Sequence, residues 1–364
     1  MNVRLVAVFL VLALAGALGG VSAEEPQGHP PPRGPVVGRS GIAATFGIVA
    51  TSQPLAARAG VVPKTAVQQK PITWPAVNSQ IGGSYPVDEL EHTLMFTLES
   101  VAVASRFAAA NTNVVADPGK RLLILTGSLT NIQTNTFPLG SDCVTVNVFS
   151  ETAERSVSSV ERSFILPGLT SFPTNLKPKE KLRFVTVVQI HAEGPIKRVA
   201  VFRGSRATRR AWYDVQKDLG TMQSAFSDGT NLRERAETKV GQVFDLGAFD
   251  MVVQSAGPVS SAGAYQSSSS TQVYAVTLKV TNTLRAPEKF GWQYTNPTLV
   301  DASGKELSWS RDLIDSASGK SAGPELQPGQ PYLLQYAFSA ERGRTLKQFT
   351  LALNAGRTIV VDLR

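Results

Sequence analysis

The chain has 364 residues, of which 42% are hydrophobic and 18% are charged, and its formal net charge is +8. These proportions are ordinary for a globular protein and exclude wholesale disorder, and the length suffices for two or three domains. The positive charge is spread thinly along the chain, so we expect no nucleic-acid partner.

The first predicted element is a secretory signal peptide over residues 1–23. Arg4 gives the start a positive charge, Leu5–Leu18 is almost wholly apolar, and Val21-Ser22-Ala23 places small residues where signal peptidase cleaves. The alternative is an uncleaved membrane anchor, for which the apolar run is somewhat short. No second long apolar segment follows. We therefore expect an exported protein, periplasmic or extracellular, with no membrane span after signal cleavage.

Residues 24–86 are rich in Pro, Gly, Ala and Ser and show no sustained period of 2 or 3.6. This composition predicts an extended, largely disordered leader ahead of the folded part of the chain.

Two regions beyond the leader contain the same short sequence motifs in the same order, 150 or 151 residues apart. The matching pairs are Arg121–Asn131 with Gln272–Asn282, Leu176–Lys179 with Leu326–Gly329, and Ile196–Val201 with Leu346–Leu351. Three matches at one spacing predict a duplicated domain, with the first copy over residues 87–204 and the second over 240–364.

Both copies consist of short strand-like runs separated by Pro- and Gly-containing turns, a pattern typical of antiparallel β-sandwiches. Residues 144–148 alternate apolar and polar side chains, as a half-buried strand does, and Asp301–Gly304 has the composition of a hairpin turn. We predict an all-β fold with two self-sufficient cores, one in each copy.

The stretch between the copies, residues 205–239, has a different pattern. Its apolar residues follow steps of 3, 4, 3 and 4, at Trp212, Val215, Leu219, Met222 and Phe226. This spacing predicts one apolar stripe on an amphipathic helix. The expected fold class is thus all-β, with two tandem immunoglobulin-like antiparallel β-sandwiches joined by a helical linker.

Each copy resembles bacterial exported immunoglobulin-like domains related to the secreted immunoprotective antigens. The resemblance covers about two-thirds of the chain and rests on Val280–Asn282, Leu326–Gly329 and Tyr332–Phe338. The first copy departs from the pattern at Lys179, where Gly is expected, so we expect a turn of a different type there. The resemblance implies the fold and no catalysis, because these domains share no active site.

No motif in the sequence predicts a reaction, a metal or a cofactor. The sequence has no Gly-x-Ser-x-Gly, no Walker A motif and no Gly-x-Gly-x-x-Gly after a strand. Four carboxylates in the second copy lack the order of a calcium loop and are expected to be solvated: Asp301, Glu306, Asp312 and Asp315. The three histidines, His29, His92 and His191, are scattered, although a triad assembled in space remains open.

The first candidate interaction site is an arginine cluster followed by two aromatics: Arg203, Arg206, Arg209, Arg210, Trp212 and Tyr213. Guanidinium groups beside aromatics bind phosphate, carboxylate or sugar-acid groups. The alternative is that the arginines solvate the start of the linker helix while Trp212 packs on a sandwich. Cations at a helix N-terminus oppose the helix dipole, which favours the binding interpretation.

The second candidate site comprises Trp292, Tyr294 and Trp309, which could stack on sugar rings or anchor a protein. Trp292 and Tyr294 share a face if that segment is extended, but burial in a core is the alternative. The sequence therefore predicts an exported, non-catalytic binding or scaffolding protein of the bacterial cell envelope. Its partner would be an envelope protein or a polysaccharide. A carbohydrate or envelope-polymer binder and an unrecognised enzyme with a site between the sandwiches are the alternatives.

Overall fold

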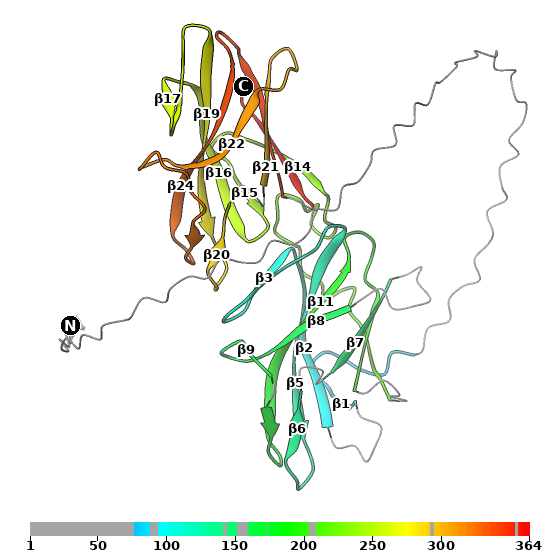
Figure 1. Ribbon diagram of the computed structural model, residues 1–364. Helices are drawn as coiled ribbons and strands as arrows, with labels where there is room; N and C mark the ends of the chain where they lie inside the picture. The colour runs from blue at the N-terminus through cyan, green and yellow to red at the C-terminus, as the bar shows by residue number, and fades with distance from the viewer. Residues whose placement is uncertain are drawn as a thin grey trace, which may run out of the picture. The chain divides into compact units, whose positions relative to one another are not determined.

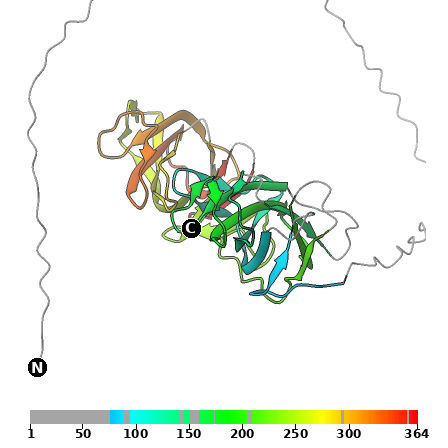
Figure 2. The same cartoon turned by 90° about the horizontal axis from the view of Figure 1, so that it is seen from below.

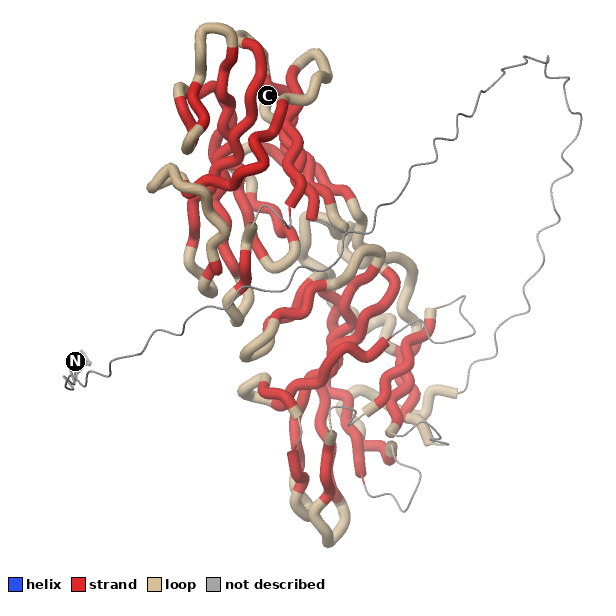
Figure 3. Tube along the Cα trace, in the orientation of Figure 1, coloured by secondary structure: helices blue, strands red, loops and turns tan. Residues whose placement is uncertain are grey.

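The computed structural model describes residues 76–87, 94–140, 144–150, 159–172, 174–203, 209–291, 295–353 and 356–364. The predicted signal peptide and residues 24–75 of the predicted leader lie outside these ranges. Throughout the described ranges the regular elements are β-strands, and Figure 3 shows only strands and loops there. This part of the chain contains no helix with the length and apolar character needed to span a membrane.

The first copy of the repeat folds into two main antiparallel sheets, with two further two-stranded sheets, β3-β4 and β10-β6 (Figure 1). Its strands are β1 (Ser84–Pro86), β2 (Leu94–Ala104), β3 (Arg106–Ala108), β4 (Asn113–Val115), β5 (Lys120–Asn131), β6 (Phe137–Leu139), β7 (Thr145–Phe149), β8 (Ser159–Ile165), β9 (Thr170–Ser171), β10 (Thr174–Leu176), β11 (Lys181–His191), β12 (Arg198–Phe202) and β13 (Ala211–Asp214). The larger sheet has the order β1-β2-β5-β11-β8-β9, and the smaller has the order β13-β12-β7. The rings of Phe96 in β2 and Tyr213 in β13 lie 6.3 Å apart, so the two sheets face each other as a sandwich.

The second copy has the same arrangement. Its strands are β14 (Arg235–Lys239), β15 (Val243–Leu246), β16 (Phe249–Val259), β17 (Ser261–Ala262), β18 (Tyr265–Gln266), β19 (Thr271–Asn282), β20 (Glu288–Lys289), β21 (Thr295–Asp301), β22 (Ser308–Asp315), β23 (Glu325–Leu326), β24 (Pro331–Glu341), β25 (Leu346–Leu353) and β26 (Thr358–Asp362). Sheet orders are β15-β16-β19-β24-β22 and β14-β26-β25-β21, with β14 parallel to β26. Phe349 in β25 lies 6.0 Å from Tyr336 in β24, ring to ring, so this pair of sheets also shares a core. Figure 2 shows the strands of both copies from a second direction, cyan to green for the first and yellow to red for the second.

Most strands of the main sheets correspond one to one between the two copies. The order β1-β2-β5-β11-β8 matches β15-β16-β19-β24-β22, and β13-β12-β7 matches β26-β25-β21. Even the irregularity between β2 and β5, at Leu98/Ser100, has a counterpart between β16 and β19, at Val253/Ser255. The alternation predicted for residues 144–148 is present, because Val146 and Val148 belong to the core.

A fully buried asparagine ends the central strand of the first copy. The Asn131 side-chain amide donates to the backbone carbonyls of Asn135, at 2.7 Å, and Leu176, at 3.0 Å. Its Oδ1 accepts a hydrogen bond from the backbone NH of Gln133 at 3.0 Å. One side chain therefore ties the end of β5 to the turn that follows it and to β10.

Asn282 makes the same three bonds in the second copy. Its amide donates to the carbonyls of Ala286, at 2.7 Å, and Leu326, at 3.0 Å, and its Oδ1 accepts from the NH of Leu284 at 3.0 Å. We call this arrangement around Asn131 and Asn282 the asparagine clamp. A buried amide must have its polar atoms paired, and here the asparagine of the Thr-Asn motif donates to the carbonyl of the leucine in the Leu-x-Pro motif. This explains why the two motifs recur together.

The turn that follows each Leu-x-Pro motif has the same conformation in both copies. Lys179 has a φ of 62° and Gly329 a φ of 75°, and both backbone NH groups donate to the clamp asparagine's carbonyl, at 2.8 and 2.7 Å. The expectation of a different turn type at Lys179 was therefore wrong. The clamp and the carbonyl bond fix the turn strongly enough to hold a lysine in the left-handed region.

The connection between the copies is not helical in residues 209–239. The aromatic run Ala211–Asp214 forms β13 and pairs with β12, and the chain then passes through turns and irregular structure before β14. Side chains expected on one helical stripe are buried nevertheless, namely Trp212, Val215, Met222 and Phe226, and Leu219 is half-buried. The segment does not form a helix because its first residues pair with the open edge of β12. Gly220, Ser224 and Gly229 then favour turns.

The boundaries of the copies also differ from the expected ones. The first sandwich includes β1, before residue 87, and β13, beyond residue 204, and the second begins with β14, before residue 240. The cores are not separate. The main apolar cluster runs from the first sandwich through Met222, Phe226 and Leu232 into the second, so the expectation of two self-contained cores was wrong.

Candidate functional site

The predicted arginine cluster lies only partly within the described residues. Arg206 falls outside them, Arg209 is exposed, and the half-buried Arg210 places its guanidinium carbon 4.5 Å from the ring centroid of Phe202. Arg203 stacks in the same way, at 4.6 Å from the ring of Phe137. Two of the predicted guanidinium groups are therefore held over aromatic faces, a contact that is both cationic and planar.

The two aromatics of that cluster point to opposite faces of the sheet, because neighbouring strand positions alternate. Trp212 lies on the outer face, 9% exposed, with its ring 5.2 Å from that of Phe149. Tyr213 lies on the inner face, fully buried beside Phe96, and burial raises the pKa of its hydroxyl. The structure therefore places Tyr213 in the core, where it cannot reach a partner directly.

The outer face of sheet β13-β12-β7 differs between the two copies. Phe149, Ala200 and Trp212 form a small apolar cluster there, and Ala200 pairs across the strands with Trp212. In the second sandwich, the corresponding cross-strand pair is Thr350 with Val360. An outer aromatic cluster is therefore not required by the sandwich itself.

The second predicted site is not assembled in the described residues. Trp292 and Tyr294 lie outside them. Trp309, in β22, is half-buried against the core with its ring 6.1 Å from that of the fully buried Tyr336. Trp309 therefore packs against the sandwich core with part of its side chain still exposed.

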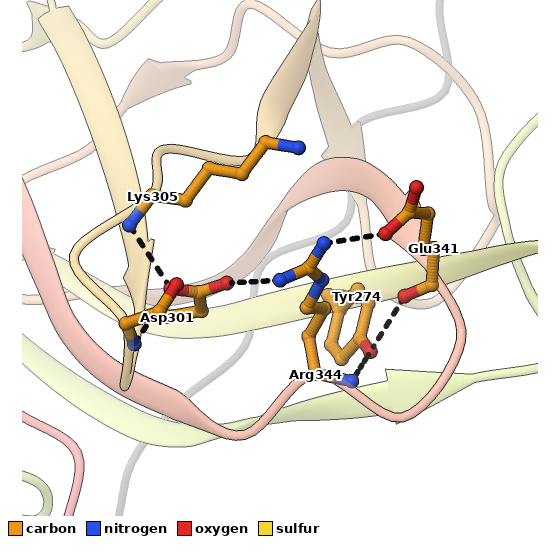
Figure 4. Close-up of polar contacts among 6 residues, drawn as sticks. Tyr274, Asp301, Lys305, Glu341 and Arg344 are labelled. Atoms are coloured by element: carbon orange, nitrogen blue, oxygen red, sulfur yellow. Dashed lines mark hydrogen bonds and ion pairs between the residues drawn. The ribbon is translucent and has the colours of Figure 1, made fainter.

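A buried carboxylate stands in the hairpin turn predicted at residues 301–304 (Figure 4). Asp301 is 2% exposed, and its Oδ1 accepts hydrogen bonds from the NH groups of Ser303, at 2.9 Å, and Lys305, at 3.0 Å. Its Oδ2 lies 3.3 Å from an Nη of Arg344. The Ser303 hydroxyl, these NH groups and Arg344 together hold the pKa of Asp301 below its usual value.

The surroundings of Asp301 form a closed network. Arg344 also pairs with Glu341, and its backbone NH donates to the hydroxyl of Tyr274 at 2.9 Å (Figure 4). The hairpin turn is thus confirmed, but the expectation that Asp301 is solvated was wrong. Because its oxygens already have partners, this carboxylate fixes the turn and is poorly placed to act as a base.

Direct polar contacts join the two sandwiches within the compact unit formed by residues Gln69–Arg364. Arg357 is 6% exposed and donates to the backbone carbonyls of Lys120, at 2.7 Å, and Ala116, at 3.4 Å. Arg106 forms an ion pair with Asp250 at 2.6 Å. Burial lowers the pKa of the Arg357 guanidinium, and the nearby carboxylates of Glu234 and Asp245 oppose this shift.

A cavity of about 440 Å³ lies where the connecting segment crosses the end of the first sandwich. It is lined by Val103, Arg121, Gly194, Pro195, Ile196, Gln216, Leu219, Thr230 and Asn231. The lining joins β2, β5, the turn after β11 and the segment after β13. Its size and its mixture of apolar and polar residues are those of small-molecule sites.

Arg121 is the charged residue of this cavity and is only 2% exposed. Its two Nη atoms donate to the backbone carbonyls of Thr230 and Gly194, and its Nε has no hydrogen-bond partner. Burial lowers the pKa of the guanidinium, and the nearby Asp228 opposes this shift. The sequence interpretation missed Arg121. It shares strand parity with the core residues Leu123 and Leu125, but Leu122 and Ile124 are also apolar, so parity alone could not place it inside.

The described residues include no group of three or more His, Cys, Asp or Glu that could hold a metal ion. His191 is exposed at the end of β11, and His29 and His92 lie outside the described ranges.

Comparison with known proteins gives no family for this chain. No family model matches the sequence. No curated protein matches it. Among solved structures, an uncharacterized β-sandwich protein of Clostridium difficile is 13% identical, with a TM-score of 0.28, over 35% of this chain and 88% of that one.

Two further solved structures are similar at the same remote level. A "putative lipoprotein" of Bacillus subtilis is 16% identical, with a TM-score of 0.25, over 34% of this chain and 39% of its own length. A conserved domain protein of Bacillus anthracis is 11% identical, with a TM-score of 0.19, over 79% of this chain and 91% of that chain. These likenesses are too remote to carry an argument about function.

Proposed function

We propose that this chain is an exported, non-catalytic binding or scaffolding protein of the bacterial cell envelope, built from two immunoglobulin-like sandwiches. Its contact surface for an acidic envelope protein is the stretch at the start of β13 that carries Arg209 and Arg210. The observation that carries the proposal is the pair of neighbouring arginines where β13 begins, of which Arg209 is exposed and Arg210 is half-buried. The cluster of Phe149, Ala200 and Trp212 on the same sheet is buried and does not itself offer a contact.

Stacking of the arginine side chain supports the same surface. The guanidinium of Arg210 is held over Phe202, so part of its conformational freedom is already lost before a partner arrives. A pre-ordered guanidinium loses less entropy when it forms bidentate bonds with a carboxylate. The polar contacts between the sandwiches, including Arg357, favour a scaffold in which this surface has a fixed place.

Site-specific photocross-linking in cells tests the proposal. A photoreactive phenylalanine analogue replaces the exposed Arg209, and the control chain carries it at the exposed Lys320 in the second sandwich. We expect one discrete adduct from position 209 and none of the same mass from position 320. The double substitution Arg209→Glu, Arg210→Glu is expected to abolish an adduct formed from a neighbouring exposed position, Asp214, without lowering the melting temperature by more than about 2 °C.

The outcome that contradicts the proposal is equally defined. Identical cross-linking patterns from positions 209 and 320, or an adduct that persists in the double glutamate variant, would exclude this face as the specific contact.

A further inference from the structure

The cavity at Arg121 is distinct from the proposed contact face and has a chemistry of its own. Its walls are largely apolar, formed by Val103, Pro195, Ile196 and Leu219. Its polar groups are the Arg121 guanidinium and the side chains of Gln216, Thr230 and Asn231. An apolar chamber with one cation predicts a ligand that is mostly apolar and carries an anionic group.

The charge of Arg121 has no anionic partner within the cavity. Neither Asp nor Glu is among the residues that line it, and the two bonds of the guanidinium go to neutral carbonyl oxygens. Asp228 lies near enough to affect the Arg121 pKa, but its carboxylate accepts from the NH groups of Thr230 and Asn231 and pairs with Arg233 at 3.7 Å.

A buried cation whose hydrogen bonds go to neutral carbonyls is costly, and an arriving anion would offset that cost. A guanidinium carries five N–H donors, and the two carbonyl bonds leave donors for a carboxylate.

The second copy provides an internal control for Arg121. Gln272 occupies the equivalent position at the start of β19, since Arg121 pairs with Ile190 and Gln272 pairs with Ala340 in matching strands. Its neutral amide donates to the carbonyl of Val259 at 2.7 Å and to the hydroxyl of Ser267 at 3.0 Å. The sandwich therefore folds with a neutral residue there, and at this position only the first copy carries a buried charge.

We propose that this cavity binds a small monocarboxylate with an apolar body. The carboxylate lies against Arg121, and the body packs on Val103, Ile196 and Leu219. One cation can neutralise the single negative charge of a carboxylate. A phosphate would carry a higher charge into a largely apolar cavity, where part of it would be unpaired. The side-chain amide of the exposed Gln216 supplies a neutral hydrogen-bond donor at the cavity, whereas the Asn231 amide donates to Asp228 at 3.2 Å.

Titration of the full chain with hexanoate tests the assignment, with 1-hexanol and hexylammonium as probes of matched size. The readout is the ¹H–¹⁵N NMR shift of the side-chain amides of Gln216 and Asn231. Hexanoate is expected to shift both signals to saturation, and each neutral or cationic probe is expected to bind at least about tenfold more weakly.

A variant at the exposed Gln216 keeps the test independent of Arg121, whose carbonyl bonds also support the fold. Gln216→Glu adds a negative charge at the cavity, which repels the hexanoate carboxylate, and is expected to weaken hexanoate binding at least about tenfold. Gln330→Glu, at an exposed position in the second sandwich, is the matched control and is expected to leave binding unchanged.

Three results would overturn the assignment: no saturable shift with hexanoate, binding of 1-hexanol as tight as that of hexanoate, or equal binding by the Gln216→Glu and Gln330→Glu chains. None of them bears on the cross-linking result, because Arg209 does not line this cavity. Either proposal can therefore be refuted without affecting the other.

Discussion

Exchange of the residues at the two equivalent turns tests whether the copies share one backbone conformation. Lys179 and Gly329 both have positive φ, at 62° and 75°, and the Lys179 side chain is exposed. An L-residue in the left-handed region costs about 1–2 kcal/mol, whereas glycine loses about 0.5–1 kcal/mol more backbone entropy on folding. Lys179→Gly is therefore expected to stabilise the protein by about 0.5–1 kcal/mol.

The reverse change should show the opposite sign. A Cβ at Gly329 would meet no atom within 4 Å, so the cost of Gly329→Ala is conformational and amounts to about 1 kcal/mol. Gly323→Ala is the control, since its Cβ also enters open space but its φ is not positive. It is expected to be neutral or slightly stabilising.

Thermal unfolding followed by circular dichroism measures these effects, and about 1 kcal/mol corresponds to a melting-temperature change of roughly 2 °C in a protein of this size. A lower melting temperature for Lys179→Gly would refute the reasoning, because it would mean that the lysine is not in the left-handed conformation.

Three further changes have defined outcomes. Asn131→Ala and Asn282→Ala each remove three hydrogen bonds of a buried side chain and should each cost about 3 kcal/mol in urea denaturation, and a cost below about 1 kcal/mol for either would exclude the clamp. Arg357→Met should loosen the junction and speed amide exchange at Gly119, which bonds across it to Glu234, by about tenfold; unchanged exchange would contradict this role. Hydrogen bonds from Tyr332 and Ser318 lower the pKa of Asp315 to about 2, so its stabilising contribution is present above pH ~4 and is lost as the pH falls toward 2. The fall in melting temperature between pH 5 and pH 2 should therefore be smaller in Asp315→Asn than in the wild type, and an equal fall would count against the assignment.

The repeat was predictable because the residues of its sequence motifs make specific hydrogen bonds. A buried asparagine needs partners for its amide and its carbonyl, so Thr-Asn and Leu-x-Pro recur at a fixed spacing in both copies. The hairpin at Asp301 was predictable for a similar reason, because Asp and Gly at those positions meet the needs of a tight turn. These features depend on local chemistry that the sequence contains.

The features that sequence reasoning missed depend on contacts between distant segments. The spacing of Trp212 to Phe226 fits a helix, but pairing of Ala211–Asp214 with β12 decides the local structure. The burial of Asp301 depends on Arg344, and that of Arg121 on carbonyls from two other segments. Neither partner set lies near its residue in the sequence, so neither could be read from a local pattern.

The duplication of one sandwich unit around a buried asparagine is tested most directly by proton exchange at the side-chain amides of Asn131 and Asn282. Both amides donate to buried carbonyls, whereas Asn175 is exposed. NMR measurements should show both buried amides exchanging at least about a hundredfold more slowly than that of Asn175. If either exchanged as fast as Asn175, the two copies would not share the unit described.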